Sequence, residues 1–252
     1  GFVTGTSTHH INIGGHDRRY RLYLPAGRSA PAPLVVMMHG YSATARQAER
    51  ASKWDETADS GKFVVAYPDG LDRAWNVNGG GCCGQPASEG VDDIGFIGAV
   101  VADIAKNAGV DPRKVYATGM SNGGIMSYTL ACATDIFAAI GPVAGVQLNS
   151  CQAPHPTSVM HIHGTADEVV PYPGGRGFKG MNFPPAQASD AFWRNVDQCG
   201  DPAVATTGSV TISTAGCADK RGVVLVTVAG GGHDWPDSAA KELWHFFADH
   251  PR

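Results

Sequence analysis

The sequence predicts an α/β fold, in which helices lie on both faces of a mostly parallel central sheet. Continuous apolar runs, typical of strands buried on both faces, occupy residues 34–38, 63–67, 137–146 and 159–163. Segments with helical spacing separate these runs, and strands that alternate with helices form parallel sheets. The third observation is a glycine break at Gly119, where the apolar run that begins at Val115 turns into a helical segment.

The N-terminal part of the chain is expected to begin with an antiparallel strand pair. In residues 9–24, apolar and polar side chains alternate on both sides of a Gly14-Gly15 turn. Residues 45–60 have helical spacing. Residues 71–90 are expected to form a long loop pinned by its glycines and cysteines, and a loop of this length is either functional or disordered.

Helices and strands also alternate in the middle of the chain. Asp92 or Asp93 is expected to cap a helix, because apolar residues recur at helical spacing directly after them. The Asp111-Pro112 pair ends that connection and leads into the next strand. A second helix is predicted at residues 125–133.

The C-terminal third contains a segment of unusual composition. Residues 172–187 are rich in Gly and Pro, and we expect them to form a lid or an insertion. Helices are predicted at residues 188–198 and 238–248, and the last strands at residues 210–213 and 223–228.

Composition and charge limit the classes of function. No low-complexity linker, charge run or repeat divides residues 1–252, so a single domain is expected, and 43% hydrophobic residues support a sizeable core. The net charge of −4 and the lack of a basic stripe argue against a nucleic-acid partner. No apolar run approaches the roughly 20 residues of a membrane span. The chain shows no signal peptide at Gly1, so a leader has been removed or the sequence trimmed.

An even number of cysteines predicts export and disulfide bonds. The six are Cys82, Cys83, Cys132, Cys151, Cys199 and Cys217. Cys199–Cys217 is the best candidate pair, because it would tie the end of a helix to a nearby hairpin. Cys132–Cys151 is the second, since it brackets one helix–strand unit. The pairing of the two adjacent cysteines stays open, because neighbouring Cα atoms lie about 3.8 Å apart, below the usual disulfide range.

No metal ion or other cofactor is expected. A zinc site is unsupported because no C-x-x-C pair faces a second one. His161 and His163 share one face of a predicted strand, which could suggest a metal. No clear third ligand follows them, so we interpret both as packing residues of the strand.

The central motif is Gly119-Met-Ser-Asn-Gly123, a G-x-S-x-G pattern with a strand before it and a helix after it. A serine side chain projects from such a sharp turn only when its neighbours two residues away lack bulk, and glycine meets that need. The pattern therefore predicts a nucleophile elbow at Ser121. The alternative is a glycine-rich turn in which the serine only caps the helix.

A serine hydroxyl needs a base to remove its proton, and the base needs an acid to orient it. Asp167 is our candidate acid, because it lies in the turn just past the strand of residues 159–163. Glu168 is the rival, while Asp190 and Asp197 would be helical. A turn-forming aspartate is the alternative role for Asp167.

The candidate base is His233. It follows the final predicted strand in a glycine-rich loop, from which its imidazole could reach both Ser121 and Asp167. His245 and His250 lie on or beyond the last helix, and we interpret them as surface residues.

Stabilisation of a tetrahedral intermediate needs two main-chain N–H groups aimed at its oxygen. Asn122, which follows the nucleophile, should supply one, and Tyr41 the other. His39 is expected to shape the Tyr41 loop rather than to react. Trp75 and Trp235 are candidate walls of a substrate pocket, with core packing as the alternative.

Several short motifs occur in one order along nearly the whole chain. They are His-Gly-Tyr at 39–41, Tyr-Pro-Asp-Gly at 67–70, Trp75-Asn76, Cys82-Cys-Gly84, Val-Asp-Asp-Ile-Gly-Phe at 91–96, Gly-Met-Ser-Asn-Gly-Gly at 119–124, His-Gly-Thr-Ala-Asp at 163–167 and His-Asp-Trp-Pro at 233–236. Together they resemble the polyhydroxybutyrate depolymerase-like esterase family, which includes secreted feruloyl and acetyl xylan esterases. The resemblance implies an α/β-hydrolase fold with Ser121, Asp167 and His233 as the catalytic triad.

We therefore expect a secreted, extracellular serine esterase that is a monomer and forms an acyl-enzyme. Polymer-degrading members of the family often carry an added substrate-binding domain, and none is recognised in this sequence. This favours soluble plant cell-wall esters, with feruloylated polysaccharide first. Hydroxybutyrate oligomers and acetylated xylan are the alternatives. A more distant alternative is a non-catalytic binding protein on a hydrolase scaffold, which would usually lack part of the triad.

Overall fold

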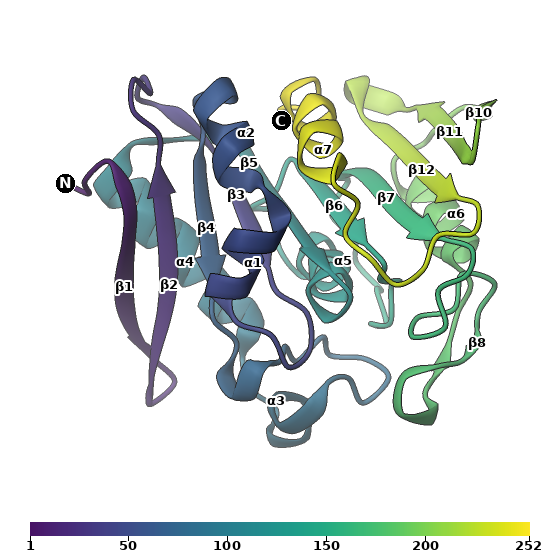
Figure 1. Cartoon of the computed structure of the whole chain (residues 1–252), viewed down its shortest axis with the longest axis horizontal. Helices are drawn as coiled ribbons and strands as arrows, with labels where there is room; N and C mark the ends of the chain where they lie inside the picture. Colours follow the sequence, from purple (N-terminus) through teal and green to yellow (C-terminus); the bar gives the residue numbers. More distant parts are fainter.

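A ten-stranded sheet forms the centre of the computed structural model, which describes residues 1–252 (Figure 1). Its strands are β1 (Gly5–Ile13), β2 (His16–Leu24), β3 (Ala32–Met38), β4 (Val64–Pro68), β5 (Val110–Met120), β6 (Ala139–Val143), β7 (Ser158–Gly164), β10 (Ala203–Thr207), β11 (Val210–Gly216) and β12 (Gly222–Val228). Their order across the sheet is β1-β2-β4-β3-β5-β6-β7-β12-β11-β10. The six strands from β4 to β12 pair in parallel, and the strands at both edges pair antiparallel.

Helices cover both faces of this sheet. They are α1 (Ala45–Ser52), α2 (Trp54–Gly61), α3 (Gly84–Glu89), α4 (Asp93–Ala108), α5 (Asn122–Ala133), α6 (Ala186–Val196) and α7 (Ala239–Ala248), with short 3-10 turns at Leu71–Arg73, Phe178–Gly180 and Ala218–Lys220. In Figure 1, α1, α2 and α7 lie in front of the sheet, and α4 and α5 lie behind it. None of these helices is long and apolar enough to cross a membrane.

Two hydrophobic cores result from the alternation of side chains along each strand. In β3, Leu34 and Val36 belong to the core on the side of α4 and α5, whereas Val35 and Met37 belong to the core on the side of α1, α2 and α7. Successive side chains of a strand point to opposite faces, so a strand buried on both faces must be apolar throughout. This explains the continuous apolar runs of the sequence.

The structure differs from the predicted elements at three places. The helix expected at residues 45–60 breaks into α1 and α2 at Lys53, whose φ is +63°. The loop expected at residues 71–90 contains α3. Strand β10 was not predicted, because all five of its side chains are exposed and no apolar alternation marks it.

Three disulfide bonds connect the elements. Cys132–Cys151 links the end of α5 to the segment after β6, and Cys199–Cys217 links the segment after α6 to the end of β11. The third bond joins the adjacent residues Cys82 and Cys83, whose pairing the sequence left open.

Candidate active site

Ser121 lies between the end of β5 and the first residue of α5. Its φ of +55° and ψ of −119° are rare for a residue with a side chain, and such geometry persists only where the surroundings impose it. The N–H of Ser121 donates to the carbonyl of Val143 at 2.8 Å. A Cβ atom at Gly119 would collide with the main chain of Gly123 across the turn, and one at Gly123 would collide with the Met38 carbonyl at the end of β3, so both positions require glycine. These contacts fix the serine on a strand-to-helix elbow.

Asp167 lies in the turn after β7 and is 3% exposed. Its Oδ1 accepts the main-chain N–H groups of Val169 and Val170, both at 2.9 Å. Its Oδ2 accepts a hydrogen bond from His233 Nδ1 at 2.8 Å. Burial alone would raise the pKa of Asp167, but the hydrogen bonds from His163, His233 and Val170 outweigh burial and hold it well below its usual range. The carboxyl group is therefore ionised where it meets the imidazole.

Close contact between two loops brings Asp167 and His233 together. The N–H of Ala166 donates to the carbonyl of Gly231 at 2.8 Å. A Cβ atom at Gly164 would collide with the same Gly231 carbonyl, so a larger residue would push the loops apart. The lack of a side chain at Gly164, the last residue of β7, thus permits the approach that brings the imidazole to the carboxylate.

The rival acids and bases of the sequence lie elsewhere. Glu168 is exposed, and Asp190 pairs with Arg194 at 2.9 Å. Asp197 accepts the N–H of Thr157 at the far end of β7. Of the two later histidines, His245 is exposed on α7 and His250 bonds the carbonyl of Phe246.

Ser121 and His233 line one cavity of about 430 Å³. Most of its other wall residues are apolar: Ala43, Met120, Ile125, Val169, Val170, Phe178, Phe183 and the Cys82–Cys83 pair. Asp167 is not among them and lies behind His233, away from the space that a ligand would fill. The cavity is therefore an apolar pocket in which a hydroxyl and an imidazole are the reactive groups.

Two main-chain N–H groups are available beside the serine. Tyr41 and Asn122 both line the pocket. The Tyr41 N–H has no hydrogen-bond partner in the structure. Asn122 is the first residue of α5, where an N–H has no acceptor within the helix, and the helix N-terminus adds partial positive charge. This arrangement can stabilise an oxyanion.

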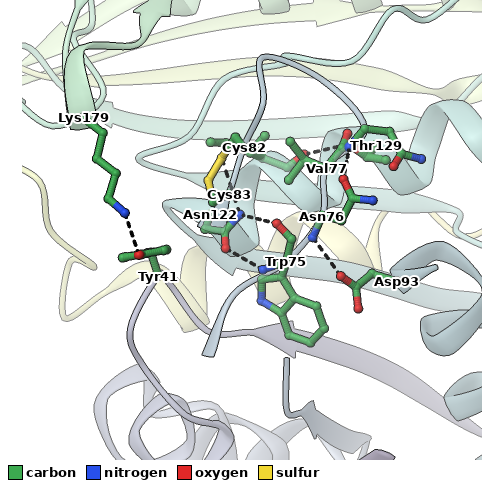
Figure 2. The surroundings of a disulfide bond; sticks show 12 residues. Tyr41, Trp75, Asn76, Val77, Cys82, Cys83, Asp93, Asn122, Thr129 and Lys179 are labelled. Carbon is green, nitrogen blue, oxygen red and sulfur yellow. Dashed lines mark hydrogen bonds between the residues drawn. A yellow bond between two sulfur atoms is a disulfide. The ribbon is translucent and has the colours of Figure 1, made fainter. Parts of the chain in front are cut away.

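The side chain of Asn122 holds the neighbouring loop (Figure 2). It is 1% exposed, accepts the Trp75 N–H at 2.7 Å through Oδ1, and donates to the Trp75 carbonyl at 3.1 Å through Nδ2. Asp93 and Thr129 hold the next residues, through the N–H of Asn76 and the carbonyl of Val77. The long loop is thus fixed by Asn122 and Asp93, which the sequence analysis considered only in other roles, and by Thr129, which it did not consider.

His39 shapes the Tyr41 loop and does not face the pocket. Its Nε2 accepts the Gly70 N–H at 2.9 Å, so its Nδ1 carries the proton and donates to the Gly40 carbonyl at 2.7 Å. Burial lowers its pKa, which favours this neutral form.

The prediction that Trp75 and Trp235 form walls of the substrate pocket is wrong. Trp75 is completely buried, and its indole donates to the carbonyl of His39 at 2.9 Å, so it supports the Tyr41 loop from the core. Trp235 donates to the carbonyl of Ser52 and packs against the core on the side of α1 and α7. Neither residue lines the pocket.

The aromatic wall instead comes from the segment of residues 172–187, which contains the two-stranded hairpin of β8 (Gly175–Arg176) and β9 (Asn182–Phe183). Phe178 meets the Tyr41 ring edge-on at 4.9 Å, and Lys179 donates to the Tyr41 hydroxyl at 2.8 Å (Figure 2). The only sequence signal for this wall was the unusual Gly and Pro content of the segment.

His161 and His163 are buried side by side on β7, hydrogen-bonded to each other at 2.9 Å. The structure contains no cluster of three or more His, Cys, Asp or Glu side chains suited to a metal ion.

Comparison with known proteins agrees with this geometry. The family model for esterase PHB depolymerase matches residues 18–171. Feruloyl esterase B of Piromyces equi is 32% identical over 85% of this chain, which spans 41% of that protein's length. Feruloyl esterase C of Emericella nidulans is 29% identical over 96% of this chain and 87% of that protein.

Among solved structures, the acetyl xylan esterase from Aspergillus awamori superposes with a TM-score of 0.73 at 17% identity, over 96% of this chain and 99% of that one. Identity this low supports the fold alone, and that fold is the α/β-hydrolase type. The family model, by contrast, covers more than half of the sequence, including the strand-to-helix elbow and the aspartate turn. The chain therefore belongs to the polyhydroxybutyrate depolymerase family of esterases, and it is a carboxylic ester hydrolase.

Proposed function

We propose that this protein is a serine esterase that forms an acyl-enzyme on Ser121 and prefers hydroxycinnamoyl esters such as feruloylated plant polysaccharide. One observation carries the proposal. Ser121, on the strained elbow, shares a pocket with His233. The Nδ1 atom of His233 is hydrogen-bonded to the ionised Asp167.

The reaction follows from these positions. His233 Nε2 takes the hydroxyl proton as Ser121 Oγ attacks the ester carbonyl carbon, and the carbonyl oxygen becomes an oxyanion facing the N–H groups of Tyr41 and Asn122. The imidazolium then gives the proton to the leaving alcohol as the carbon–oxygen bond breaks. Water, deprotonated by His233, attacks the acyl-enzyme, and the proton returns to Ser121 as the acid leaves. Asp167 stabilises the imidazolium in both halves.

The pocket supports an aromatic acyl group. Phe178, Phe183 and Tyr41 contribute ring surface, and a volume of about 430 Å³ lies within the range of small-molecule sites. An acetyl group would fill little of this space, so we expect acetylated xylan to be a poorer substrate than a feruloyl ester. Two relatives with similar sequences are named feruloyl esterases. A 3-hydroxybutyrate oligomer is the second candidate, because the family model bears the name of that polyester.

We propose that the protein works outside the cell as a monomer. Its six cysteines form three disulfide bonds, and such bonds persist mainly in oxidising compartments. Light scattering of the purified protein tests the proposed monomeric state, because a monomer has a mass of 26.3 kDa and a dimer would have twice that mass.

A substrate panel tests the activity. Methyl ferulate, acetylated xylan and a 3-hydroxybutyrate oligomer are assayed side by side with the wild type and with Ser121→Ala. We expect the highest kcat/KM on methyl ferulate and no turnover by the variant, which should stay folded. Undiminished hydrolysis by Ser121→Ala would refute the role of the serine, and a preference for acetylated xylan would refute the substrate class. Fluorophosphonate labelling separates an esterase from a binding protein, because only an activated serine reacts.

A further inference from the structure

A chain of buried side chains continues behind Asp167 into the core. His163 Nε2 lies 3.3 Å from Asp167 Oδ2, His163 Nδ1 lies 2.9 Å from His161 Nε2, and His161 Nδ1 lies 2.6 Å from the Tyr128 hydroxyl. Each of these four side chains is at most 3% exposed. Hydrogen bonds therefore run from Tyr128 on α5, through His161, to His163 on β7. His163 Nε2 in turn bonds the Val170 carbonyl at 2.8 Å and lies 3.3 Å from the carboxylate that holds His233.

The surroundings determine where each proton sits. His163 Nε2 faces only acceptors, Asp167 Oδ2 and the Val170 carbonyl at 2.8 Å, so it must carry a proton. A neutral imidazole carries one proton, so His163 Nδ1 accepts from His161 Nε2. His161 Nδ1 then accepts from the Tyr128 hydroxyl. Burial, and then the neighbouring His163, lower the pKa of His161 well below its usual value, which agrees with a neutral ring.

Other polar groups packed against the chain are compatible with this direction. The Tyr172 ring meets His163 edge-on at 5.7 Å, but its hydroxyl is engaged with Thr227. Burial, and then Asp190 on α6, raise the pKa of Tyr128 well above its usual value, against a smaller opposing effect of Ser189. Tyr128 therefore keeps its proton and can donate it. The reverse direction would leave an unprotonated His163 Nε2 against two oxygen acceptors, which is unfavourable in a buried site.

From this geometry we infer that His163 is a positioning residue for the esterase reaction: its Nε2–H group, bonded to the Val170 carbonyl and 3.3 Å from Asp167 Oδ2, fixes the carboxylate for His233, while Tyr128 and His161 lock its tautomer. The inference rests on the proposed function of Asp167. Two main-chain N–H groups hold Oδ1, and the Nε2–H group of His163 lies 3.3 Å from Oδ2, which also accepts from His233. The carboxylate is then restrained at both oxygens.

The first test needs no variant. In protein labelled with ¹⁵N-histidine, the imidazole nitrogen shifts report which nitrogen carries the proton. We expect His161 and His163 each to carry a proton at Nε2 and none at Nδ1, with N–H protons protected from exchange. A proton on His163 Nδ1 in place of Nε2 would overturn the inference, because Nε2 would then face the Val170 carbonyl and Asp167 Oδ2 without a proton.

The second test uses a matched pair of variants. In His163→Gln the amide nitrogen reaches the place of Nε2, whereas in His163→Asn it reaches only the place of Nδ1. We expect His163→Asn to lower kcat about tenfold at unchanged KM, which is the upper end of the range for a single neutral hydrogen bond. We expect His163→Gln to stay within about threefold of the wild type. The His233 Nδ1 proton resonance should move in the Asn variant and stay near its wild-type position in the Gln variant.

Controls separate the possible failures. Active sites are counted by fluorophosphonate labelling, so that kcat refers to folded enzyme. Equal, wild-type kcat in both variants would show that His163 only packs, and would overturn the inference while Ser121→Ala remains inactive. Activity in Ser121→Ala would instead refute the proposed function itself. If neither variant folds, the tautomer measurement on the wild type decides.

Discussion

Replacing Asn122 by Ala should weaken the fold far more than the chemistry. The Asn122 side chain satisfies both the N–H and the carbonyl of Trp75, and all four atoms are buried. The variant leaves the Trp75 N–H without a partner, which costs roughly 1–3 kcal/mol. The Trp75 carbonyl keeps the Cys83 N–H at 3.0 Å and loses one of two hydrogen bonds, which costs about 0.5–1.5 kcal/mol. We therefore expect the free energy of unfolding to fall by about 2–4 kcal/mol. The proposed oxyanion donor is the main-chain N–H, which the variant keeps, so kcat per active site should fall by less than about tenfold.

Urea unfolding measures the first quantity, and ester hydrolysis normalised by fluorophosphonate labelling measures the second. Asn122→Asp is the matched control, because it keeps the acceptor for the Trp75 N–H but sets a second oxygen against the Trp75 carbonyl. It should be at least as destabilised as the Ala variant. A variant of unchanged stability whose kcat falls about 10³-fold would refute the reasoning, since a loss of that size is typical of removing an oxyanion donor itself.

Two further predictions concern buried carboxylates. Asp167→Asn should lower kcat by about 10⁴-fold, as the corresponding change does in a serine protease of the Ser-His-Asp type, because the amide cannot orient the imidazole. Hydrolysis of p-nitrophenyl acetate, with folding checked by circular dichroism, tests this prediction. A loss in kcat of less than about tenfold would contradict it. Burial raises the pKa of Asp197 to about 7, against opposing effects of the Thr157 N–H and Arg221. The folded protein therefore holds this proton more tightly than the unfolded chain, so the stabilisation is complete below about pH 4 and is lost as the pH rises to 7. Asp197→Asn keeps the acceptor for Thr157 and should gain up to about 4 kcal/mol relative to the wild type between pH 4 and pH 8, measured by urea unfolding; a stability difference that is independent of pH would contradict it.

The sequence predicted those helices and strands whose buried side chains produce a regular pattern of apolar residues. Strand β3 and the pair of β1 and β2 lie where alternation and apolar runs indicated. The break at Lys53 was not predictable, because a left-handed lysine has no local signature and tertiary packing decides where the helix stops. Strand β10 was missed because it is stabilised by pairing with β11 and not by burial.

Ser121, Asp167 and His233 could be chosen from the sequence because the proposed chemistry requires a serine, an acid and a histidine, each in a turn that follows a strand of the sheet. The structure brings Ser121, Asp167 and His233 to one site. The pocket wall follows no such rule. Trp75 looked like a wall because aromatic residues in loops often contact ligands, yet its indole supports the core. The donation from His163 was missed because alternate residues of a buried strand were expected to pack and nothing more.

The two sides of the pocket differ in how firmly they are held. Ser121 stands at the start of α5, and eleven of the twelve residues of this helix are buried. A strained serine costs of order 1–3 kcal/mol, which such extensive packing can offset. The opposite wall comes from the hairpin segment, whose residue Lys179 is exposed while Phe183 is buried. Because no part of the acyl-transfer machinery lies on that hairpin, Phe183 and its neighbours can determine which acyl group enters without disturbing the serine. Changes there should alter KM and acyl preference, whereas changes beneath the elbow should alter kcat for every ester.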